Sequence, residues 1–577
     1  MTAGRPADLM KQALLSLLIM VIAQWVLVLS GRAPVFDGRL FDPDCYMHLQ
    51  RARQMIDSGV WRLPLDGRVD APFGGVMHWT SLFDLLLVIG AKALALLGLS
   101  VDNALFWWGS LLSPLLLLPA LPVLYWGFRP LLGEGRMMPL IVLLLVLQGQ
   151  AGAAFQLGRP DHQSLLMASF LIQLGCVAAM LDGRAGRRTA LLSGLALGLA
   201  MWCSVEGLLF VLVTTVPLAL AWALDGRPGL RLLRPYAAAA LAVVGIALVY
   251  ERPEGALLTS QTRLSLVHAL ALAGGLAALM LAWPVECRLH TRRTRLALLL
   301  GLALAALAPV ATVFPDFLGG PWGKLDPALS VWHQEVEELQ PLWPNSTKRL
   351  LLCLNQFAIP LATLPLLLLR LRRAGARDGW LLLPLALTTV LFWGLALAQG
   401  RWVAYVQLAL LVPAAMTVHL LWHRAPRVRT AVFATVMAVQ VGAGATLQSA
   451  KAARATTLAC DWSEAMTLLA AEPGEGRIVL TDLYSGPEIL WRTRYRVVGG
   501  PYELADAIRD TAAFMRGDDG TAIDVLRRRT IEQVLLCRGD DDADGPLATA
   551  LRHHSAPPGF TPLPAPDGFV RYAVTRP

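Results

Sequence analysis

The apolar run ALLSLLIMVIAQWVLVLSG, residues 13–31, is followed by LFDPDCYMHLQRARQMIDSG, residues 40–59. The first run has about the 20 residues that a helix needs to cross a bilayer. It follows a basic N-terminus and lacks a small-residue cleavage site, so it predicts a retained helix and not a cleaved signal peptide. The second run gathers carboxylates, a histidine and arginines just beyond this span. Ionisable groups at a membrane boundary are costly and usually mark a site.

The composition of the whole chain extends this prediction. Hydrophobic residues make up 56% of the 577 residues and charged residues 16%, which excludes a soluble globular protein and predicts a polytopic α-helical membrane protein. The net charge of +9 does not indicate nucleic-acid binding, because the arginines are distributed over short connectors and form no single patch.

These basic connectors predict the topology. Positive residues are retained in the cytoplasm, and the sequence between successive connectors is long enough for two spans. We therefore expect about thirteen transmembrane helices, with a cytoplasmic N-terminus and a C-terminal segment on the opposite side. The basic connectors are residues 129–136, 182–188, 225–234, 287–295, 370–377 and 423–429.

The predicted organisation is a transmembrane domain, residues 1–450, and an extramembrane α/β domain, residues 451–577. The transmembrane domain carries a first outer loop at 32–80 and a long outer loop at 315–347. Residues 82–98 are expected to form a partly embedded outer helix, because a full crossing there would invert every later connector. The high Leu, Ala and Arg content favours a bacterial inner membrane, with the C-terminal domain in the periplasm.

The C-terminal segment alternates between helical and extended patterns, which is typical of a small α/β domain. The stretch PPGFTPLPAPDG, residues 557–568, is expected to be a surface loop. Cys460 and Cys537 are the only cysteines of this segment, and a disulfide between them remains open. Helices are expected at 463–471, 486–493 and 503–515, and strands at 477–482, 494–500, 531–537 and 569–574.

Two acidic motifs lie on the predicted outer side. Asp42 and Asp44 are separated by one residue, a spacing that can aim both carboxylates at a hard cation such as Mg²⁺ or Mn²⁺. The alternative is that Asp42, before Pro43, caps the helix that follows. Asp161 and His162, in GRPDHQ, precede a later apolar run, and there too Asp161 could serve only as a helix cap.

Two further motifs lie on the same side. SVWHQEVEELQPLWPN, residues 330–345, contains Glu335, Glu337 and Glu338, which form either a solvated acidic face or part of a loop folded onto the membrane surface. Arg401, in AQGRWVAY, stands between two spans. It can bind phosphate bidentately, or it can be an interfacial arginine beside Trp402.

These motifs, in this order, resemble those of the catalytic subunit of oligosaccharyltransferase and its single-subunit bacterial and archaeal relatives, which are membrane glycosyltransferases of the GT-C fold. The resemblance covers about residues 10–505. DCYMHLQRAR is similar to the first acidic motif of that family and GRPDHQ to the second. APFGGVMHWTSLFDLLL, residues 71–87, is similar to the intervening Gly-rich segment, and VEELQPLW to a loop motif in which Glu338 precedes Gln-Pro.

The resemblance implies a divalent cation, Mn²⁺ or Mg²⁺, held by Asp44, Asp161 and Glu338, with His162 as a further candidate ligand. It implies a polyprenyl-(di)phosphate-linked sugar donor whose phosphates bind Arg401. Asp44 and Glu338 would orient an acceptor for attack on the anomeric carbon with inversion. The absence of a P-loop or Rossmann fingerprint agrees with a donor that is not a nucleotide sugar.

The sequence departs from the family at two places. The W-W-D-Y-G motif that recognises Asn-X-Ser/Thr acceptors corresponds to LTDLYSG, residues 480–486, where Asp482 and Tyr484 remain as weak acceptor-binding candidates but the paired Trp is missing. We therefore expect a protein or glycan acceptor other than that sequon. Gln163 stands where relatives carry an acidic residue or His. A lipid-linked sugar transporter or flippase is the alternative, although the sequence shows neither midplane charges nor repeats.

Overall fold

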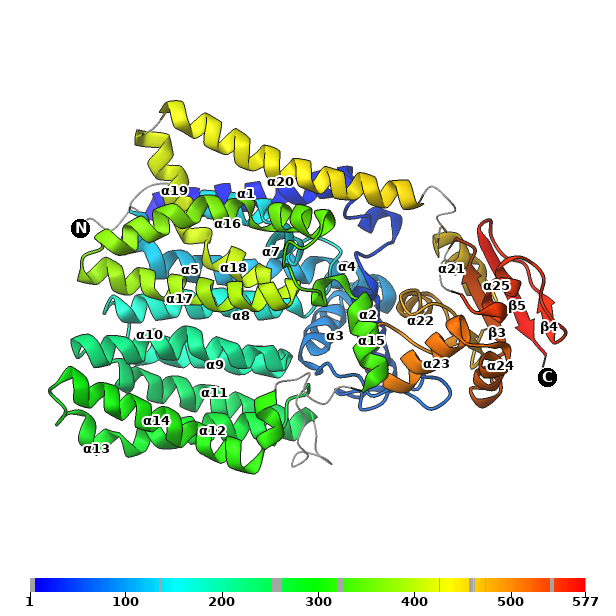
Figure 1. Ribbon diagram of the computed structural model, residues 1–577, viewed down its shortest axis with the longest axis horizontal. Helices are drawn as coiled ribbons and strands as arrows, with labels where there is room; N and C mark the ends of the chain where they lie inside the picture. Colours follow the sequence, from blue (N-terminus) through cyan, green and yellow to red (C-terminus); the bar gives the residue numbers. More distant parts are fainter. Residues whose placement is uncertain are drawn as a thin grey trace.

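A computed structural model describes residues 6–133, 137–251, 262–319, 326–424, 426–455, 460, 462–472, 474–539 and 544–575. Long helices form a bundle, and a small domain with a β-sheet lies at one end of it (Figure 1). The first described helix, α1 (Pro6–Leu29), begins at the opposite end of the bundle from this domain (Figure 1).

The described residues contain nine helical segments that are long and apolar enough to cross a membrane, and a pair of helices bent by 52° adds a tenth. The nine are α1 (Pro6–Leu29), α4 with α5 (Val101–Leu115, Leu117–Leu132), α8 (Gln163–Leu181), η2 with α10 (Val205–Leu209, Phe210–Asp225), α11 (Gly229–Glu251), α14 (Arg292–Val313), α16 (Thr347–Arg373), α17 (Ala376–Ala398) and α20 (Pro426–Ala455). The bent pair consists of η5 and α18 (Gly400–Trp402, Val403–Ala409) and α19 (Leu411–Arg424).

Two shorter apolar helices, α6 (Met137–Leu147) and α12 (Leu266–Leu281), and the short helix α9 (Arg187–Cys203) also lie in the described part of the bundle. The nine to ten candidate spans of the described residues are fewer than the thirteen expected. Two basic connections, α16–α17 and α19–α20, lie at the end of the bundle away from the sheet (Figure 1). Residues 82–98 form α3 (Leu82–Ala95), which packs on α2 (Pro43–Ser58) and α4. Its 14 residues reach about 21 Å, short of the roughly 30 Å hydrocarbon core. α3 is therefore too short for a full crossing, as expected, and the side of the membrane on which it lies stays a prediction.

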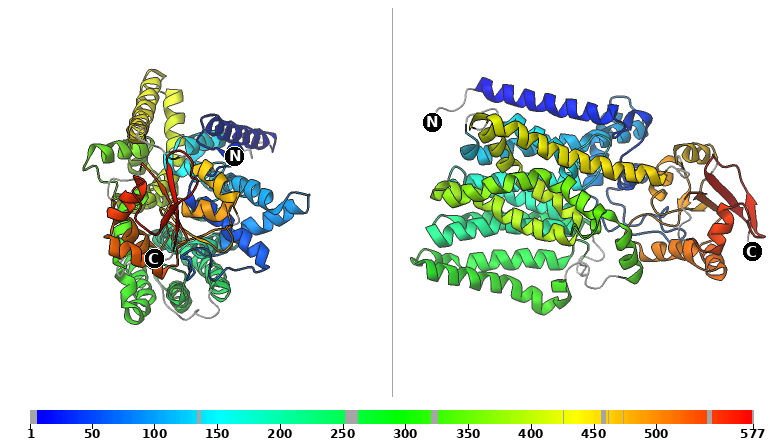
Figure 2. Two further views of the ribbon diagram at one scale, coloured as in Figure 1. Left: turned by 90° about the vertical axis from the view of Figure 1, so that its right-hand side faces the viewer. Right: turned by 45° about the horizontal axis from the view of Figure 1, so that its top comes forward.

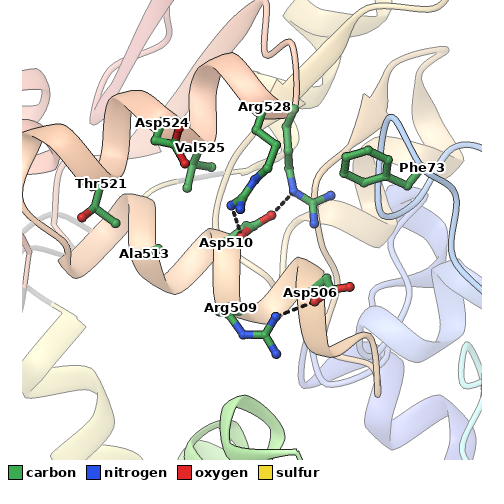
Figure 3. A pocket seen from close by; sticks show the side chains of 10 residues that line it. Phe73, Asp506, Arg509, Asp510, Ala513, Thr521, Asp524, Val525 and Arg528 are labelled. Atoms are coloured by element: carbon green, nitrogen blue, oxygen red, sulfur yellow. Dashed lines mark hydrogen bonds and ion pairs between the residues drawn. The ribbon is translucent and has the colours of Figure 1, made fainter.

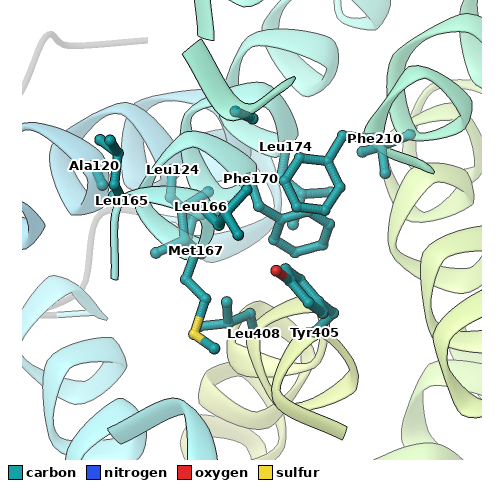
Figure 4. Close-up of a cluster of buried hydrophobic side chains, with 14 of the residues drawn as sticks. Ala120, Leu124, Leu165, Leu166, Met167, Phe170, Leu174, Phe210, Tyr405 and Leu408 are labelled. Carbon is teal, nitrogen blue, oxygen red and sulfur yellow. The ribbon is translucent and has the colours of Figure 1, made fainter. Parts of the chain in front are cut away.

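The core of the bundle is built around α8. Nearly all of its side chains are buried, and Phe170 packs on Phe210 and Tyr405 at ring distances of 5.2 and 5.1 Å (Figure 4). In contrast, α1 and α20 run along the outside of the bundle (Figure 2) and expose apolar side chains, as lipid-facing helices do. The start of α8 is therefore fixed by close packing, and it carries the second acidic motif.

The remaining short helices are η1 (Val35–Asp37), α7 (Gly149–Ala153), α13 (Trp283–Glu286), η3 (Pro315–Gly319), α15 (Pro327–Glu335) and η4 (Glu337–Leu339).

The C-terminal domain has a five-stranded mixed sheet in the order β2-β1-β3-β5-β4. β1 is parallel to β2 and β3, and β5 is antiparallel to β3 and β4. A disulfide joins Cys460, at the entry to the domain, to Cys537 at the end of β3. The elements are α21 (Trp462–Ala470), β1 (Ile478–Leu480), α22 (Gly486–Arg492), β2 (Arg496–Val497), α23 (Ala505–Arg516), α24 (Asp519–Arg528), β3 (Gln533–Cys537), α25 (Pro546–Arg552), β4 (Phe560–Pro562) and β5 (Phe569–Val574).

The sequence prediction for this domain was wrong at one element and incomplete at two others. Part of residues 557–568, expected to be a loop, forms β4, in which Phe560 pairs with Val574 of β5. Proline is tolerated there because β4 lies at the edge of the sheet, where one side needs no ladder hydrogen bonds. Helices α24 and α25 were not expected, because each is short and gains its stability from packing on the sheet.

The first outer loop fixes the C-terminal domain to the bundle. The Ala71 N–H donates to Val497 O at 3.0 Å, and the Val497 N–H donates to Arg68 O at 2.8 Å. The Arg68 side chain also donates to the carbonyl oxygens of Thr493 and Tyr495. The loop thus extends the sheet beside β2, while α22 packs on α2.

Candidate active site

The first acidic motif begins α2, and its two aspartates have different surroundings. Asp42 Oδ1 accepts the N–H of Cys45 at 3.1 Å, so the capping role considered for Asp42 is confirmed. Its Oδ2 also lies 3.4 Å from Arg159 Nε. Asp44 is half-buried in the first turn, and His48, four residues later, lies on the same face of the helix.

The second acidic motif lies at the start of α8. Asp161 is buried, and its Oδ1 accepts the N–H of Gln163 at 3.0 Å, so one of its oxygens does serve the helix terminus. Its Oδ2 lies 3.3 Å from Arg159 Nη2, but it has no hydrogen-bond donor among the residues described. His162 Nδ1 lies 3.1 Å from Asp161 Oδ1.

A histidine that the sequence analysis did not assign lies against this motif. One ligand atom each from His48, Asp161 and His162 lies within 4.8 Å of the other two, and all three residues are buried. His48 Nε2 is 3.1 Å from His162 Nδ1, and His48 Nδ1 is 2.6 Å from Asp84 Oδ1. The i, i+4 relation of Asp44 and His48 could have indicated this position, whereas no local pattern indicates Asp84 on α3.

Asp84 and Trp79 hold the His48 ring in place. Arg51 Nε donates to Asp84 Oδ2 at 2.7 Å, so both carboxylate oxygens of Asp84 are engaged. Trp79 stacks on His48, with ring centroids 4.5 Å apart and planes inclined by 14°. Tyr502, from the C-terminal domain, packs edge-on against Trp79 at 4.9 Å. The small domain therefore contributes a wall to this site.

The outer-loop glutamates have different roles. Glu337 pairs with Lys348 at 2.9 Å, and the side chain of Glu335 lies outside the described residues. Glu338 is exposed on η4. The loop is held to the α17–α18 junction because the Gly400 N–H donates to Gln340 O at 2.8 Å. A Cβ at Gly400 would lie 3.3 Å from this oxygen, so the absence of a side chain permits the close approach.

Arg401, next to Gly400, forms an ion pair with Glu206 of η2. Its guanidinium still influences Glu338, because the positive charges of Arg401 and Arg159 favour the ionised form of the Glu338 carboxyl. The structure thus brings Arg401 and Glu338 within electrostatic reach of each other, although they belong to separate segments.

The carboxylates of the predicted site also act on one another. Burial raises the pKa of Asp44 well above its ordinary value, and the nearby charges of Asp42, Asp161 and Glu338 raise it further. Burial would also raise the pKa of Asp161, but the hydrogen bond and charge of His162, together with Arg159, hold it below the ordinary value. Asp44 therefore lies among several carboxylates, whose negative charge Arg159 offsets only in part.

His78 lies near this cluster, within electrostatic reach of several positively charged groups. Its Nδ1 atom is buried and has no hydrogen-bond partner within the described part of the chain. Burial lowers the pKa of His78 well below its ordinary value, and the positive charges of His162, Arg263 and Arg401 lower it further. The sequence analysis quoted His78 within residues 71–87 but assigned it no role.

Asp482 and Tyr484 lie in the turn before α22. Asp482 Oδ1 accepts the N–H groups of Tyr484 and Ser485 at 2.8 and 3.0 Å, and its Oδ2 accepts the Ser485 hydroxyl at 2.9 Å. The Asp482 carboxylate therefore stabilises its own turn, while the Tyr484 side chain is exposed.

Comparison with known proteins gives no match at the level of sequence: no model of a protein family matches the chain, and no curated protein does. Its structure, however, is similar to that of the oligosaccharyltransferase of Archaeoglobus fulgidus. The apo form of that enzyme gives a TM-score of 0.69 with 14% identity, over 91% of this chain and 69% of the other.

Two complexes of an oligosaccharyltransferase from the same organism are similarly related. The complex with an inhibitory peptide and a dolichol-phosphate gives a TM-score of 0.67 and 15% identity, over 97% of this chain and 74% of the other. The complex with Zn and sulfate gives 0.64 and 15%, over 98% and 73%. At this identity the likeness shows the fold alone: the chain has a GT-C fold, followed by a small C-terminal domain with a β-sheet.

Proposed function

We propose that this protein is a membrane glycosyltransferase that moves a sugar or oligosaccharide from a polyprenyl-(di)phosphate carrier to an acceptor at the outer face of the membrane. The observation that carries the proposal is the meeting of the two acidic motifs. Arg159 lies 3.4 Å from Asp42 Oδ2 and 3.3 Å from Asp161 Oδ2, and His48 lies 3.1 Å from His162. The charges of Asp44, Asp161, Glu338 and Arg401, from four separate segments, act in the same region. In a GT-C fold, this convergence supports one polar site at the end of the bundle beside the C-terminal domain.

The donor atoms of this site fit a divalent cation. Asp161 Oδ2 is buried without a hydrogen-bond donor among the described residues, and Asp44 lies among other carboxylates. Asp44, Asp161 and Glu338 would hold the ion, with His162 as a further ligand. Carboxylates with an imidazole suit Mn²⁺ better than Mg²⁺. When bound, the cation neutralises negative charge on the departing (di)phosphate.

Residues of this chain also fit the anionic donor. Arg401 offers a guanidinium that can form paired hydrogen bonds with phosphate oxygens, and the unpartnered Nδ1 of His78 lies among positive charges. The complex of the Archaeoglobus fulgidus enzyme with a dolichol-phosphate supports a lipid phosphate as the leaving group.

The acceptor is a protein or glycan nucleophile that Asp44 and Glu338 orient for attack on the anomeric carbon, with inversion. Asn-X-Ser/Thr is not the expected acceptor, because LTDLYSG lacks the paired tryptophans and the Asp482 carboxylate closes its own turn. The hydroxyl of an acceptor Ser or Thr, if buried against this segment, would gain few hydrogen bonds.

The proposal is tested by reconstituting the protein in proteoliposomes with a fluorescent polyprenyl-diphosphate sugar and Mn²⁺. Asp44→Ala and Glu338→Ala should each lower turnover by about 100-fold or more, while a chelator should abolish it. Glu337→Ala is the matched control, because Glu337 is paired with Lys348, and it should retain activity. Turnover that persists in both Asp44→Ala and Glu338→Ala contradicts the enzyme proposal. Movement of the lipid across the bilayer without turnover would favour a flippase.

For the membrane orientation, we propose a bacterial inner membrane with the N-terminus in the cytoplasm and the C-terminal domain in the periplasm. The support is the arginine pattern of the connectors, since two of them lie at the end of the bundle away from the sheet (Figure 1). Alkaline phosphatase fused after residue 575 should be active in cells, and the same fusion in the α16–α17 connection should be inactive. The reverse result would invert the topology.

A further inference from the structure

A cavity of about 410 Å³ lies in the C-terminal domain between α23, α24 and the first outer loop (Figure 3). Such a volume is within the range of small-molecule sites, roughly 300–1,000 Å³. Three aspartates and three arginines line it, so the ionisable lining is neutral. These residues are Asp506, Asp510, Asp524, Arg509, Arg528 and Arg529.

The guanidinium of Arg529 has an unused donor in this lining. The side chain is fully buried, its Nε donates to Asp510 Oδ2 at 2.5 Å, and its Nη1 donates to Asp70 Oδ1 at 2.7 Å. Its Nη2 has no hydrogen-bond partner within the described residues. An unpaired buried donor is costly, so this atom favours a ligand that brings an acceptor oxygen.

An aromatic ring forms one wall of the cavity. The Arg529 guanidinium carbon lies over the Phe73 ring, 5.2 Å from its centroid, yet Phe73 is 58% exposed. Figure 3 shows Phe73 at one side of the cavity, across from α24 with Asp524 and Thr521. The cavity therefore combines an open apolar face with charged donors and acceptors.

We propose that this cavity binds a neutral sugar ring. A carboxylate only accepts hydrogen bonds and a guanidinium only donates them, whereas a sugar hydroxyl does both. Sugar hydroxyls can therefore bridge the ion pairs of the lining, Arg509 with Asp506 and Arg528 with Asp510. The C–H face of the sugar packs on Phe73. Three aspartates would repel an anion, and three arginines would repel a cation. The balanced lining therefore disfavours the binding of either kind of ion.

The place of the cavity connects it to the candidate active site. Arg509 Nη2 lies 3.0 Å from Asp326 Oδ2, and Asp326 begins α15, which leads into η4 and Glu338. This inference rests on the proposed function for the origin of the sugar, which is a distal unit of the lipid-linked donor or of a glycan acceptor.

Saturation-transfer NMR on the full-length protein in nanodiscs tests the binding, with methyl glycosides of the common neutral hexoses and N-acetylhexosamines as probes. At least one probe should receive saturation from the wild-type protein. Phe73→Ala and Asp524→Ala should each weaken its binding by about tenfold, the loss expected for one good contact, and Phe73→Trp should preserve it. Asp519→Ala is the control, because Asp519 is exposed on the same helix but outside the cavity.

Absence of saturation transfer from every probe, or equal binding by all variants, would overturn the proposal. Displacement of the bound glycoside by inorganic phosphate would overturn it too, by assigning the cavity to anions. In transfer assays, a raised KM for the lipid-linked donor in Phe73→Ala assigns the sugar to the donor, and a raised KM for the glycan acceptor assigns it to the acceptor. Binding without any transfer would refute the proposed enzyme and leave this site standing.

Discussion

The imidazole Nε2 of His48 lies 3.1 Å from Nδ1 of His162, although the two residues are 114 positions apart in the sequence. His48 comes from α2 and His162 from the start of α8, so the contact joins the two acidic motifs. His48 thus adds a buried imidazole beside Asp161 and His162 of the second motif.

His48 should therefore contribute to cation binding. We expect His48→Ala, and Asp84→Asn through the loss of ring orientation, to weaken Mn²⁺ binding by about 10- to 100-fold, as for other groups that orient metal ligands. Electron paramagnetic resonance of free Mn²⁺ measures the affinity without the need for activity. His290→Ala, an exposed histidine between α13 and α14, is the control. Unchanged affinity in both His48 and Asp84 variants would exclude this role.

The dependence of stability on pH should report on Asp44. Its pKa is raised in the folded state, so the folded protein binds that proton more tightly than the unfolded chain does. Without a cation, the free energy of unfolding should fall as pH rises from the ordinary carboxyl pKa to the raised value. Asp161 has a lowered pKa and stays ionised throughout this window.

Thermal unfolding in chelator across this window measures the effect. The melting temperature should fall with pH in the wild type, and Asp44→Asn should remove the part due to this carboxyl. Ionised Asp44 favours the binding of Mn²⁺, so the stabilisation of the protein by Mn²⁺ should increase with pH. A wild-type melting temperature that rises over the same window in chelator would contradict the prediction.

Arg401 should act mainly on the lipid donor. Loss of a charge-assisted hydrogen bond costs about 1.5–3 kcal/mol, so Arg401→Ala should raise the KM for a polyprenyl-diphosphate sugar by roughly tenfold to a hundredfold. Because Arg401 also pairs with Glu206, the single change leaves that carboxylate unpaired. The double variant Arg401→Ala with Glu206→Gln should recover stability but not KM. If KM recovers as well, the effect of Arg401 is structural.

The disulfide between Cys460 and Cys537 closes a loop with a sequence separation of 77 residues. Its removal should destabilise the C-terminal domain by about 2–5 kcal/mol. Thermal unfolding of Cys537→Ser, or of the wild-type protein in reductant, measures this loss. Cys287→Ser replaces an exposed free cysteine and should leave the transition unchanged. If reductant destabilises Cys537→Ser as much as it destabilises the wild-type protein, another cysteine is responsible for the effect.

Local patterns in the sequence were sufficient for much of the fold. The apolar runs and their arginine-rich connectors predicted the helices, and period-two stretches predicted β1, β3 and β5, because membrane insertion and strand burial depend on residues close together in the chain. The short edge strand β4 and helices α24 and α25 were not predicted, because their stability comes from the sheet on which they pack.

The sequence by itself determined the fold class and the order of Asp44, Asp161, Glu338 and Arg401 along the chain, since hydropathy and charge act locally. Only the tertiary structure decided that His48 lies between Asp84 and His162, that Asp42 caps a helix, and that Phe73 of an outer loop lines a cavity with Arg529. Packing of the whole chain decides which atoms meet in each of these contacts. The spacing of the residues along the sequence does not encode the distances between them.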